Sequence, residues 1–414
     1  MKVILAHKFF HLVGGTEIYF QHLADILEQH GHETIPFSVQ HPRNPPSKYD
    51  RFFLEPLDFR DQASSYKARN FGRILARTFY STEARRKIGA LVRETHPDIA
   101  HLQAIENHIS PSIIDELSHN EIPIVQSVNT YKHSCTSYRH YLQDKNETCE
   151  RCRGGRHYHA MRTRCVKGSL LASTLGMLEM YLHHPLMHIY HKIDRFIVPN
   201  RFLEEKMVEA GYARDKLVRL RNPYNLTSIQ AFRDPGDYIL YFGRVEPEKG
   251  VLPLVQCMRQ LPQVHLVVVG DGSDLEKCQQ QARENGVNNV DFVGSKWGKE
   301  LTPYLQSCSM VVVPSLWFEP SPYVIYQALC AGKPVIASRI GGIPDMITPE
   351  TGCLVEPGDV DALAEAIGSI SGDRAHLRKM GISARTWAEK KLSPTTYYQR
   401  IMEVYEEISG RPQY

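Results

Sequence analysis

The sequence predicts an α/β protein built from two domains, each with a doubly wound parallel sheet. Short apolar runs that suit buried strands alternate along the chain with longer amphipathic segments that suit helices. Glycine-bearing or polar loops follow the strands, which is where such sheets bind ligands. The stretch Asp234-Pro235-Gly236-Asp237 breaks regular structure near the middle of the 414 residues, and we expect the domain boundary there.

Composition narrows the class of protein. Hydrophobic residues make up 42% and charged residues 23%, as in ordinary globular domains, and a net charge of +3 gives no argument for nucleic acid. No apolar run reaches bilayer-spanning length, and residues 1–6 lead into polar residues instead of a cleavage site, which predicts a strand and not a signal peptide. We therefore expect a cytoplasmic protein, in which the nine cysteines are thiols or metal ligands.

The first domain begins with a strand, a glycine-bearing loop and a helix. Residues 2–6 are apolar, Gly14-Gly15-Thr16-Glu17 follows, and residues 18–29 are amphipathic before a second strand at 35–39. Backbone N–H groups at such a helix start can hold a phosphate, although a tight turn alone would also select two glycines. The spacing is not GxGxxG, which argues against a dinucleotide.

Polar side chains lie at or just beyond the ends of two further strands, predicted over 99–102 and 124–127. His101, His108 and Asn129 are therefore candidate site residues, although each one alone would more often satisfy local backbone groups. The elements that complete this domain are predicted over residues 195–199, 201–211 and 217–220.

Four of the nine cysteines fall in a short polar segment. Two residues separate Cys149 from Cys152, thirteen residues lie between Cys135 and this pair, and twelve lie between the pair and Cys165. This spacing predicts a closed structural zinc site, in which His133, His157 or His159 could replace one thiol. The alternative is four free thiols in a reducing compartment.

The same segment is basic. From Lys132 to Lys167 there are nine Lys and Arg residues against three Asp and Glu residues. This surplus predicts a surface for an anionic acceptor or an anionic membrane leaflet, the alternative being a solvated loop face. The apolar stretch Leu170 to Tyr190, interrupted at Pro185, is expected to be a core helix, with an interfacial helix as the alternative.

The second domain opens with a predicted phosphate-binding loop. A strand at 238–242 leads into Gly243-Arg244, and Lys249-Gly250 follows five residues after the arginine. Two cations beside a permissive backbone suit a phosphate, whereas a solvated turn with two stray cations is the alternative. The GxxxxGK[ST] spacing of nucleoside-triphosphate loops is absent. Gly270-Asp271-Gly272 follows the next strand.

A strand-loop-helix-strand unit between residues 310 and 345 completes the predicted ligand site. Its first strand, 310–313, is followed by a loop with Glu319, and a helix starts at Tyr323. Its second strand, 334–337, is closed by Gly341-Gly342. A carboxylate and a glycine pair at strand ends suit a polyhydroxylated, phosphorylated ligand. Terminal helices are predicted over 360–370, 374–389 and 394–408.

In this order and spacing, the motifs resemble the retaining nucleotide-sugar glycosyltransferases of family 4, over nearly the whole chain. The resemblance is carried by Gly14-Gly15-Thr16-Glu17, Asn222-Pro223, Gly243-Arg244, Lys249-Gly250, Gly270-Asp271-Gly272, the run from Glu319 to Ser338, and Gly341 to Asp345. It implies the GT-B fold, two Rossmann-like domains facing a central cleft. The acceptor-side domain would be 1–225, with a cysteine-rich basic insertion at 132–168. The nucleotide-sugar domain would be 236–390, and helix 391–414 would return to the first domain. The cysteines are similar to a cluster in a subset of bacterial members linked to surface polysaccharide synthesis.

The resemblance also implies roles for individual residues. Arg244 and Lys249 would hold the donor diphosphate and stabilise the leaving group without a catalytic metal, and Glu319 would bind donor sugar hydroxyls. The other donor-binding residues would be Gly14, Gly15, Gly243, Gly270, Pro322, Tyr323 and Gln327, and the acceptor-side residues Asn129, His101 and His133. Gln327 stands where the family has a ribose-binding glutamate, and Asn129 where many members have a histidine.

The expected function is that of a retaining hexosyltransferase. It would move a hexose from a nucleotide-diphosphate sugar to a glycan or lipid-linked acceptor in cell-surface polysaccharide synthesis, at the inner face of the membrane. The alternative, motivated by Asn129 and Gln327, is a nucleotide-sugar- or glycan-binding protein with little turnover. A nicotinamide-dependent oxidoreductase would need a GxGxxG motif and an acidic ribose ligand that the chain lacks.

Overall fold

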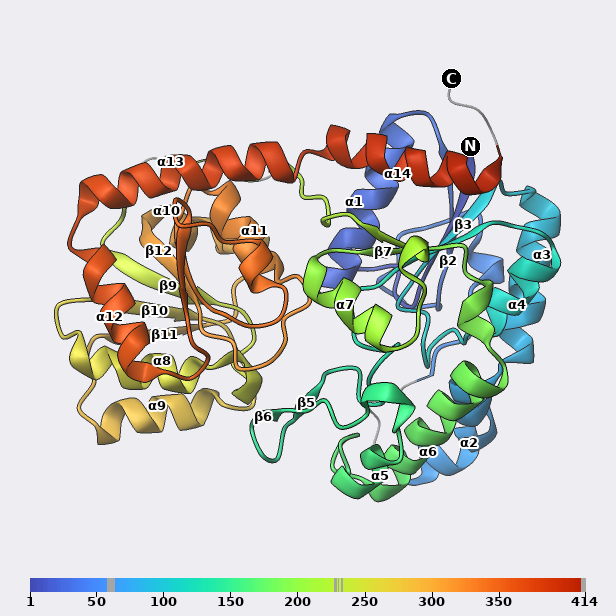
Figure 1. The fold of residues 1–414 in the computed structure, drawn as a ribbon, viewed down its shortest axis with the longest axis horizontal. Helices are drawn as coiled ribbons and strands as arrows, with labels where there is room; N and C mark the ends of the chain where they lie inside the picture. Colours follow the sequence, from blue (N-terminus) through green and yellow to red (C-terminus); the bar gives the residue numbers. More distant parts are fainter. Residues whose placement is uncertain (58–63, 227–228, 230, 232–233, 411–414) are drawn as a thin grey trace.

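The computed structural model describes residues 1–57, 64–226, 229, 231 and 234–410. Two six-stranded sheets form the centres of two domains that lie side by side (Figure 1). All strand pairs within both sheets are parallel, and helices cover the sheets. The predicted architecture of two doubly wound α/β domains is therefore confirmed.

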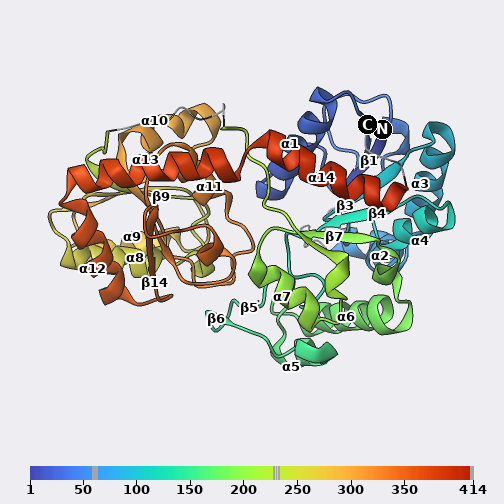
Figure 2. The same ribbon diagram turned by 45° about the horizontal axis from the view of Figure 1, so that its top comes forward.

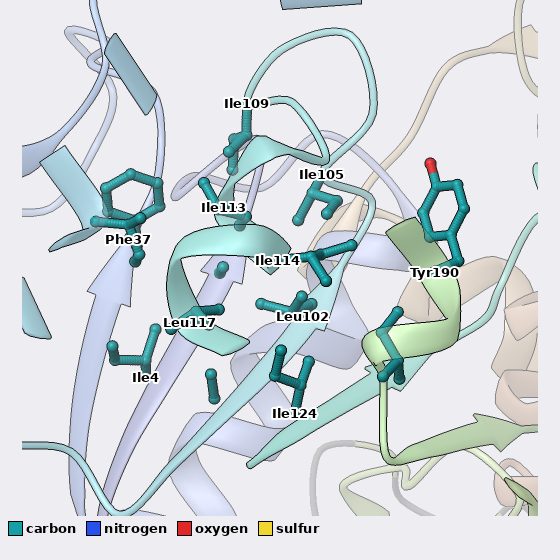
Figure 3. Packing of buried hydrophobic residues seen from close by; sticks show 14 of the residues in the cluster. Ile4, Phe37, Leu102, Ile105, Ile109, Ile113, Ile114, Leu117, Ile124 and Tyr190 are labelled. Carbon is teal, nitrogen blue, oxygen red and sulfur yellow. The ribbon is translucent and has the colours of Figure 1, made fainter. Parts of the chain in front are cut away.

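The first sheet has the order β2-β1-β3-β4-β7-β8. Its strands are β1 (Lys2–His7), β2 (Glu33–Phe37), β3 (Ile99–Gln103), β4 (Ile124–Ser127), β7 (Arg195–Val198) and β8 (Leu217–Arg219). Its helices are α1 (Gly15–Gln29), α2 (Ser64–Phe79), α3 (Thr82–Thr95), α4 (Ser112–His119) and α7 (Arg201–Glu209). Figure 3 shows the resulting core, where Ile4 and Leu102 of the sheet meet Ile113 and Leu117 of α4.

The second sheet has the order β11-β10-β9-β12-β13-β14. Its strands are β9 (Tyr238–Phe242), β10 (Leu266–Val269), β11 (Val290–Gly294), β12 (Cys308–Val313), β13 (Val335–Ser338) and β14 (Gly352–Val355). The helices are α8 (Val251–Cys257), α9 (Leu275–Glu284), α10 (Thr302–Ser307), α11 (Tyr323–Cys330), α12 (Val360–Ser371) and α13 (Arg374–Lys391). Every residue of β12 is buried, as its continuous apolar run predicts.

The last helix returns to the first domain. α13 lies on the second domain, and α14 (Pro394–Ser409) starts after the N-cap Ser393 and lies across the first (Figures 1 and 2). Its buried Tyr397, Ile401 and Tyr405 join Val3 and Tyr19 in one apolar cluster. The predicted return of the C-terminal helix is confirmed.

The insertion between β4 and β7 forms a separate outgrowth of the first domain. It contains a hairpin of β5 (Tyr141–Leu142) and β6 (Glu147–Thr148), the short helix α5 (His159–Thr163) and helix α6 (Leu170–Tyr181), which continues as a π-helical turn over Leu182–Leu186. The hairpin reaches toward the second domain in both views (Figures 1 and 2).

The stretch predicted as a core helix is not fully in the core. Leu171, Leu178 and Leu186 expose 68%, 47% and 73% of their surface, whereas Met180 is buried. The prediction was wrong for this outer face, because an apolar run alone does not say how many sides of a helix are covered. Among the described helices, none combines the length and apolarity that crossing a bilayer requires.

Candidate active site

The second sheet changes its winding direction between β9 and β12. These two strands are neighbours, yet the chain continues from β9 to β10 on one side and from β12 to β13 on the other. Loops at their carboxyl ends therefore diverge around a crevice, the usual ligand site of such a sheet. One loop carries Arg244 and Lys249 and the other carries Glu319, so the structure brings these three predicted residues together.

Glycines determine the course of the loop after β9. Gly243 and Gly250 have φ angles of 142° and 70°, which side chains disfavour. A Cβ atom on Gly270 would lie 1.9 Å from the carbonyl oxygen of Gly243, so the loop after β10 approaches closely only because residue 270 has no side chain. Gly270 thus allows the loop after β10 to pack against the loop after β9. Its direct contact with a donor stays a prediction.

Lys249, which is partly buried, and the buried Glu319 form an ion pair across the crevice. Lys249 Nζ donates to Glu319 Oε1 at 2.6 Å, and Ser315 Oγ donates to the same oxygen at 2.8 Å. Burial raises the pKa of the Glu319 carboxyl, but the charge of Lys249 and the hydrogen bonds that the carboxylate accepts, including those from Lys249 and Ser315, together hold the pKa below its usual value. The Glu319 side chain is therefore an anion at neutral pH.

Arg244 is held less tightly. Its Nη2 donates to Glu248 Oε1 at 3.4 Å, and the arginine side chain remains 51% exposed while Glu248 is buried. The guanidinium therefore keeps donors free to bind an anion in the crevice.

Two helix N-termini meet where the domains face each other. Gly14 is the N-cap residue of α1 and Pro322 that of α11, and a Cβ atom on Gly15 would lie 3.2 Å from the Tyr323 ring. Helix N-termini favour anions, which suits a diphosphate between the domains. Gln327 lies one helical turn after Tyr323, half-buried on α11.

A narrow pocket opens on the first domain at the carboxyl ends of β3 and β4. Asn129, predicted from the sequence, lines it together with Gln103 and Gln126, which were not predicted. Asn222 Nδ2 donates to Asn129 Oδ1 at 3.1 Å and orients the amide. Buried amide atoms of all three residues find no hydrogen-bond partner within the described part of the chain. Such groups are suited to binding ligand hydroxyls. The sequence signal that could have identified Gln103 and Gln126 is a polar residue at the carboxyl end of a buried strand.

His101 does not line this pocket, and its predicted acceptor-side role is corrected. The ring is buried, with Nδ1 2.6 Å from Tyr405 Oη and Nε2 2.7 Å from Ser127 Oγ. Tyr19 Oη is 2.5 Å from the same Ser127 hydroxyl. Both ring nitrogens are therefore used to tie the sheet to α14. Burial lowers the pKa of His101 to about 3, so the ring is neutral.

His133 lines part of the pocket, but most of its ring is in contact with other residues of the protein. Its Nδ1 lies 2.8 Å from Tyr212 Oη, and its ring packs edge-on against Tyr190 and Phe196. Burial lowers its pKa to about 3, so it is a neutral pocket wall.

The four cysteines of the insertion form no disulfide bond. Burial raises the pKa of Cys152 to about 12, and nearby Cys135 and Cys165 add to this rise, so the thiols are neighbours. No group of three or more His, Cys, Asp or Glu side chains within the described residues is arranged to hold a metal ion. The donor set has the chemistry of a zinc site, and the arrangement here does not complete one.

Two family models match consecutive parts of the chain. Glycosyltransferase Family 4 matches residues 13–228, and Glycosyl transferases group 1 matches residues 226–387, which include Arg244, Lys249 and Glu319. Two facing Rossmann-like domains with this crevice define the GT-B class of transferases. The chain belongs to glycosyltransferase family 4.

Curated relatives are about 25–34% identical to this chain over the parts that align. The sulfoquinovosyl transferase of Arabidopsis thaliana is 34% identical over 223 residues, 49% of this chain and 42% of the relative. The GDP-mannose-dependent phosphatidylinositol monomannoside mannosyltransferase of Mycolicibacterium smegmatis is 29% identical over 211 residues, 48% and 52% of the two chains. The chain thus spans about half the length of the curated relatives it matches.

Solved structures share the fold over the whole chain. A sucrose-phosphate synthase from Thermosynechococcus elongatus has a TM-score of 0.70 at 18% identity, covering 99% of both chains. Anabaena HepE in complex with UDP-glucose has a TM-score of 0.63 at 17% identity, covering 98% of this chain and all of that one. At these identities the likeness shows the fold alone.

Proposed function

We propose that the protein is a retaining glycosyltransferase that moves a hexose from a nucleotide-diphosphate sugar to a glycan or lipid-linked acceptor in cell-surface polysaccharide synthesis. The observation that carries this proposal is the convergence of Arg244, Lys249 and Glu319 on the two loops around one crevice. The UDP-glucose complex of HepE and the GDP-mannose dependence of the mycobacterial relative support a nucleotide-sugar donor.

The chemistry follows from where charge develops. When the bond between the anomeric carbon and the β-phosphate oxygen breaks, negative charge grows on the diphosphate, and Arg244 and Lys249 stabilise it. Glu319, ionised and paired with Lys249, would bind sugar hydroxyls beside the positively charged anomeric centre. On the opposite domain, Asn129 with Gln103 and Gln126 would orient the acceptor hydroxyl.

The test removes both cations. The double variant Arg244→Ala, Lys249→Ala is expected to lose binding of nucleoside diphosphates and transfer from their sugars. Arg259→Ala, Lys277→Ala is the matched control, since both residues are exposed elsewhere on this domain. Unchanged transfer by the first variant would contradict the proposal. NMR of the product anomer tests retention.

A binding protein with little turnover is the second candidate, because Gln327 offers a neutral amide at the place of the family's glutamate. Gln327→Glu separates the two. A large gain in turnover would favour the binding protein, and an equal or lower rate favours the transferase.

If the acceptor is lipid-linked and lies at the cytoplasmic face, the protein must contact the membrane. We propose that it contacts an anionic membrane through the region around α6. The exposed leucines Leu171, Leu178 and Leu186 recur at helical spacing along α6 and the turn after it. Between Arg151 and Leu178 the sequence has six Lys and Arg residues and no acidic one. Apolar side chains beside a purely basic segment suit anionic headgroups over a hydrocarbon layer.

Sedimentation with vesicles tests this contact. We expect binding to phosphatidylglycerol vesicles, little binding to phosphatidylcholine, and loss of binding in Leu171→Ser, Leu178→Ser. Ile382→Ser is the control, because Ile382 is a 54% exposed apolar residue of α13 on the other domain. Equal sedimentation of all three proteins would overturn the membrane contact.

A structural zinc in the insertion also remains a proposal, supported by the Cys149–Cys152 spacing and the neighbouring Cys135 and Cys165 thiols. Metal analysis of the purified protein is expected to show zinc that Cys149→Ser removes and Cys353→Ser does not. Protein without zinc would overturn the proposal.

A further inference from the structure

An arginine of the insertion reaches the donor loop of the other domain. Arg139 Nη1 lies 3.5 Å from Glu248 Oε1, the same oxygen that accepts from Arg244 Nη2 at 3.4 Å. Two guanidinium groups from different domains therefore converge on one buried carboxylate. The Arg139 side chain is 40% exposed, so it contacts both Glu248 and solvent.

The backbone around Arg139 is strained. Tyr138 and His140, its two neighbours, have φ angles of 66° and 51°, in the left-handed region. Such a conformation is unfavourable for residues other than glycine and persists only where surrounding contacts impose it. In this turn the side chains of Tyr138 and His140 make contacts within the insertion, and Arg139 between them contacts Glu248 of the second domain.

Both neighbours are fixed by buried contacts. Tyr138 Oη donates to Glu179 Oε2 at 3.1 Å, and Lys132 Nζ donates to Tyr138 Oη at 3.2 Å. His140 Nδ1 lies 2.9 Å from the Cys149 carbonyl oxygen, and its backbone N–H donates to Cys135 Sγ at 3.4 Å. The side chain between them is the one that the insertion presents to the second domain.

The guanidinium groups near the crevice keep donors available for an anion. Arg244 lies 3.4 Å from Glu248 and 4.0 Å from Glu246, so three carboxylates match the charges of the three cations here. Glu248 Oε2 and Arg139 Nη1 are buried atoms that have no hydrogen-bond partner in the described ranges. A diphosphate would supply acceptors to donors that now share a single carboxylate oxygen.

We propose that Arg139 is a third cation of the donor diphosphate site, supplied by the first domain, and that Glu248 positions it beside Arg244. This inference rests on the proposed function and names one further donor-binding residue for it. A diphosphate bound between Arg139 and Arg244 would then strengthen the contact that already joins the insertion to the second domain, so donor binding would stabilise this arrangement of the two domains.

Binding of UDP and of UMP separates this role from a structural latch between the domains. UMP lacks the β-phosphate, so a diphosphate contact affects UDP more. By calorimetry, Arg139→Gln is expected to weaken UDP binding by roughly tenfold and UMP binding little, with partial recovery in Arg139→Lys. Arg151→Gln is the matched control, because Arg151 is an exposed arginine of the insertion that pairs with exposed Glu147.

The outcomes distinguish the two proposals. If the wild-type protein binds none of UDP, GDP and ADP, the proposed function fails. If it binds one of them and Arg139→Gln binds it equally well, or loses the diphosphate and the monophosphate in equal measure, the role of Arg139 is overturned. Equal thermal unfolding of both glutamine variants shows that the insertion is still folded.

Discussion

The loops on the two facing domains follow sheets of the same kind but carry different chemistry. On the second domain, Arg244, Lys249 and Glu319 are charged and lie on loops that glycines shape. On the first domain, Gln103, Gln126 and Asn129 are neutral amides, and each has a buried amide atom without a hydrogen-bond partner within the described residues. Charges suit a diphosphate, which all nucleotide-diphosphate sugars share, whereas fixed amides suit the hydroxyl pattern of one acceptor.

The comparison predicts that the second domain supplies the larger catalytic effect. Glu319→Gln removes one charge and keeps the shape of the side chain, so turnover is expected to fall by roughly a hundredfold or more, as for other preorganised charges at a reacting centre. Binding of UDP should stay equal or tighten, because Lys249 is then no longer neutralised. Steady-state kinetics and calorimetry measure the two effects.

Glu356→Gln is the matched control for this change. Glu356 is exposed on the same domain and pairs with Arg339 at the surface. A small loss of turnover in Glu319→Gln, similar to that of the control, would show that the carboxylate is not near the reacting atoms.

The sequence predicted the two sides of the site unequally. Gly243-Arg244 and Lys249-Gly250 lie in one short segment, and residue type alone indicates their positive charges and the backbone freedom of the glycines. The pocket on the first domain joins residues from β3, β4 and α1, so its geometry exists only after the sheet has formed. His101 was misplaced for the same reason, since its partner Tyr405 lies 304 residues away.

The strands and helices were also predicted unequally. The apolar run of β9 and the shorter strand β4 were placed at their observed bounds. The mixed segment Gly352–Val355, which forms edge strand β14, and the highly polar helix α9 were not predicted. At an edge or on an exposed face, tertiary contacts outweigh the local pattern.

Gly270→Ala tests whether the charged loop depends on its glycines. The new Cβ would lie 1.9 Å from the Gly243 carbonyl oxygen, so we expect a loss of about 1–3 kcal/mol in the free energy of unfolding and weaker UDP binding. Gly372→Ala is the control, because nothing lies within 4 Å of its Cβ position. Equal urea unfolding of the two variants would contradict the close approach of the loops.

The neutral side of the site is expected to give a smaller, acceptor-specific effect. Asn129→Ala removes one amide held by Asn222, so kcat/KM for the acceptor should fall roughly tenfold, the value of about one hydrogen bond, with donor affinity unchanged. Asn120→Ala, at the far end of α4, is the control. An equal fall in donor affinity would place Asn129 in the donor site instead.

The distribution of histidines predicts that the stabilities of the two domains depend differently on pH. All but His265 and His376 of the 20 histidines precede residue 226. Burial lowers the pKa of His7, His101 and His133 to about 3, from 6.5 in the unfolded chain. Between these values the unfolded state binds a proton that the native state does not. Stability is therefore complete above pH 6.5 and falls with decreasing pH by about 1.4 kcal/mol per pH unit for each such histidine.

Urea unfolding between pH 7.5 and 5 checks this difference between the domains. The three tryptophans, Trp297, Trp317 and Trp387, all follow residue 236, so their fluorescence reports the second domain, and far-UV circular dichroism reports both. We expect the midpoint from circular dichroism to fall with pH more than the midpoint from fluorescence. His101→Gln, which keeps a polar side chain between Tyr405 and Ser127 but cannot titrate, should reduce the pH slope by the share of one histidine. An unchanged slope in this variant would mean that His101 is not held neutral, and the buried network under α14 would need another account.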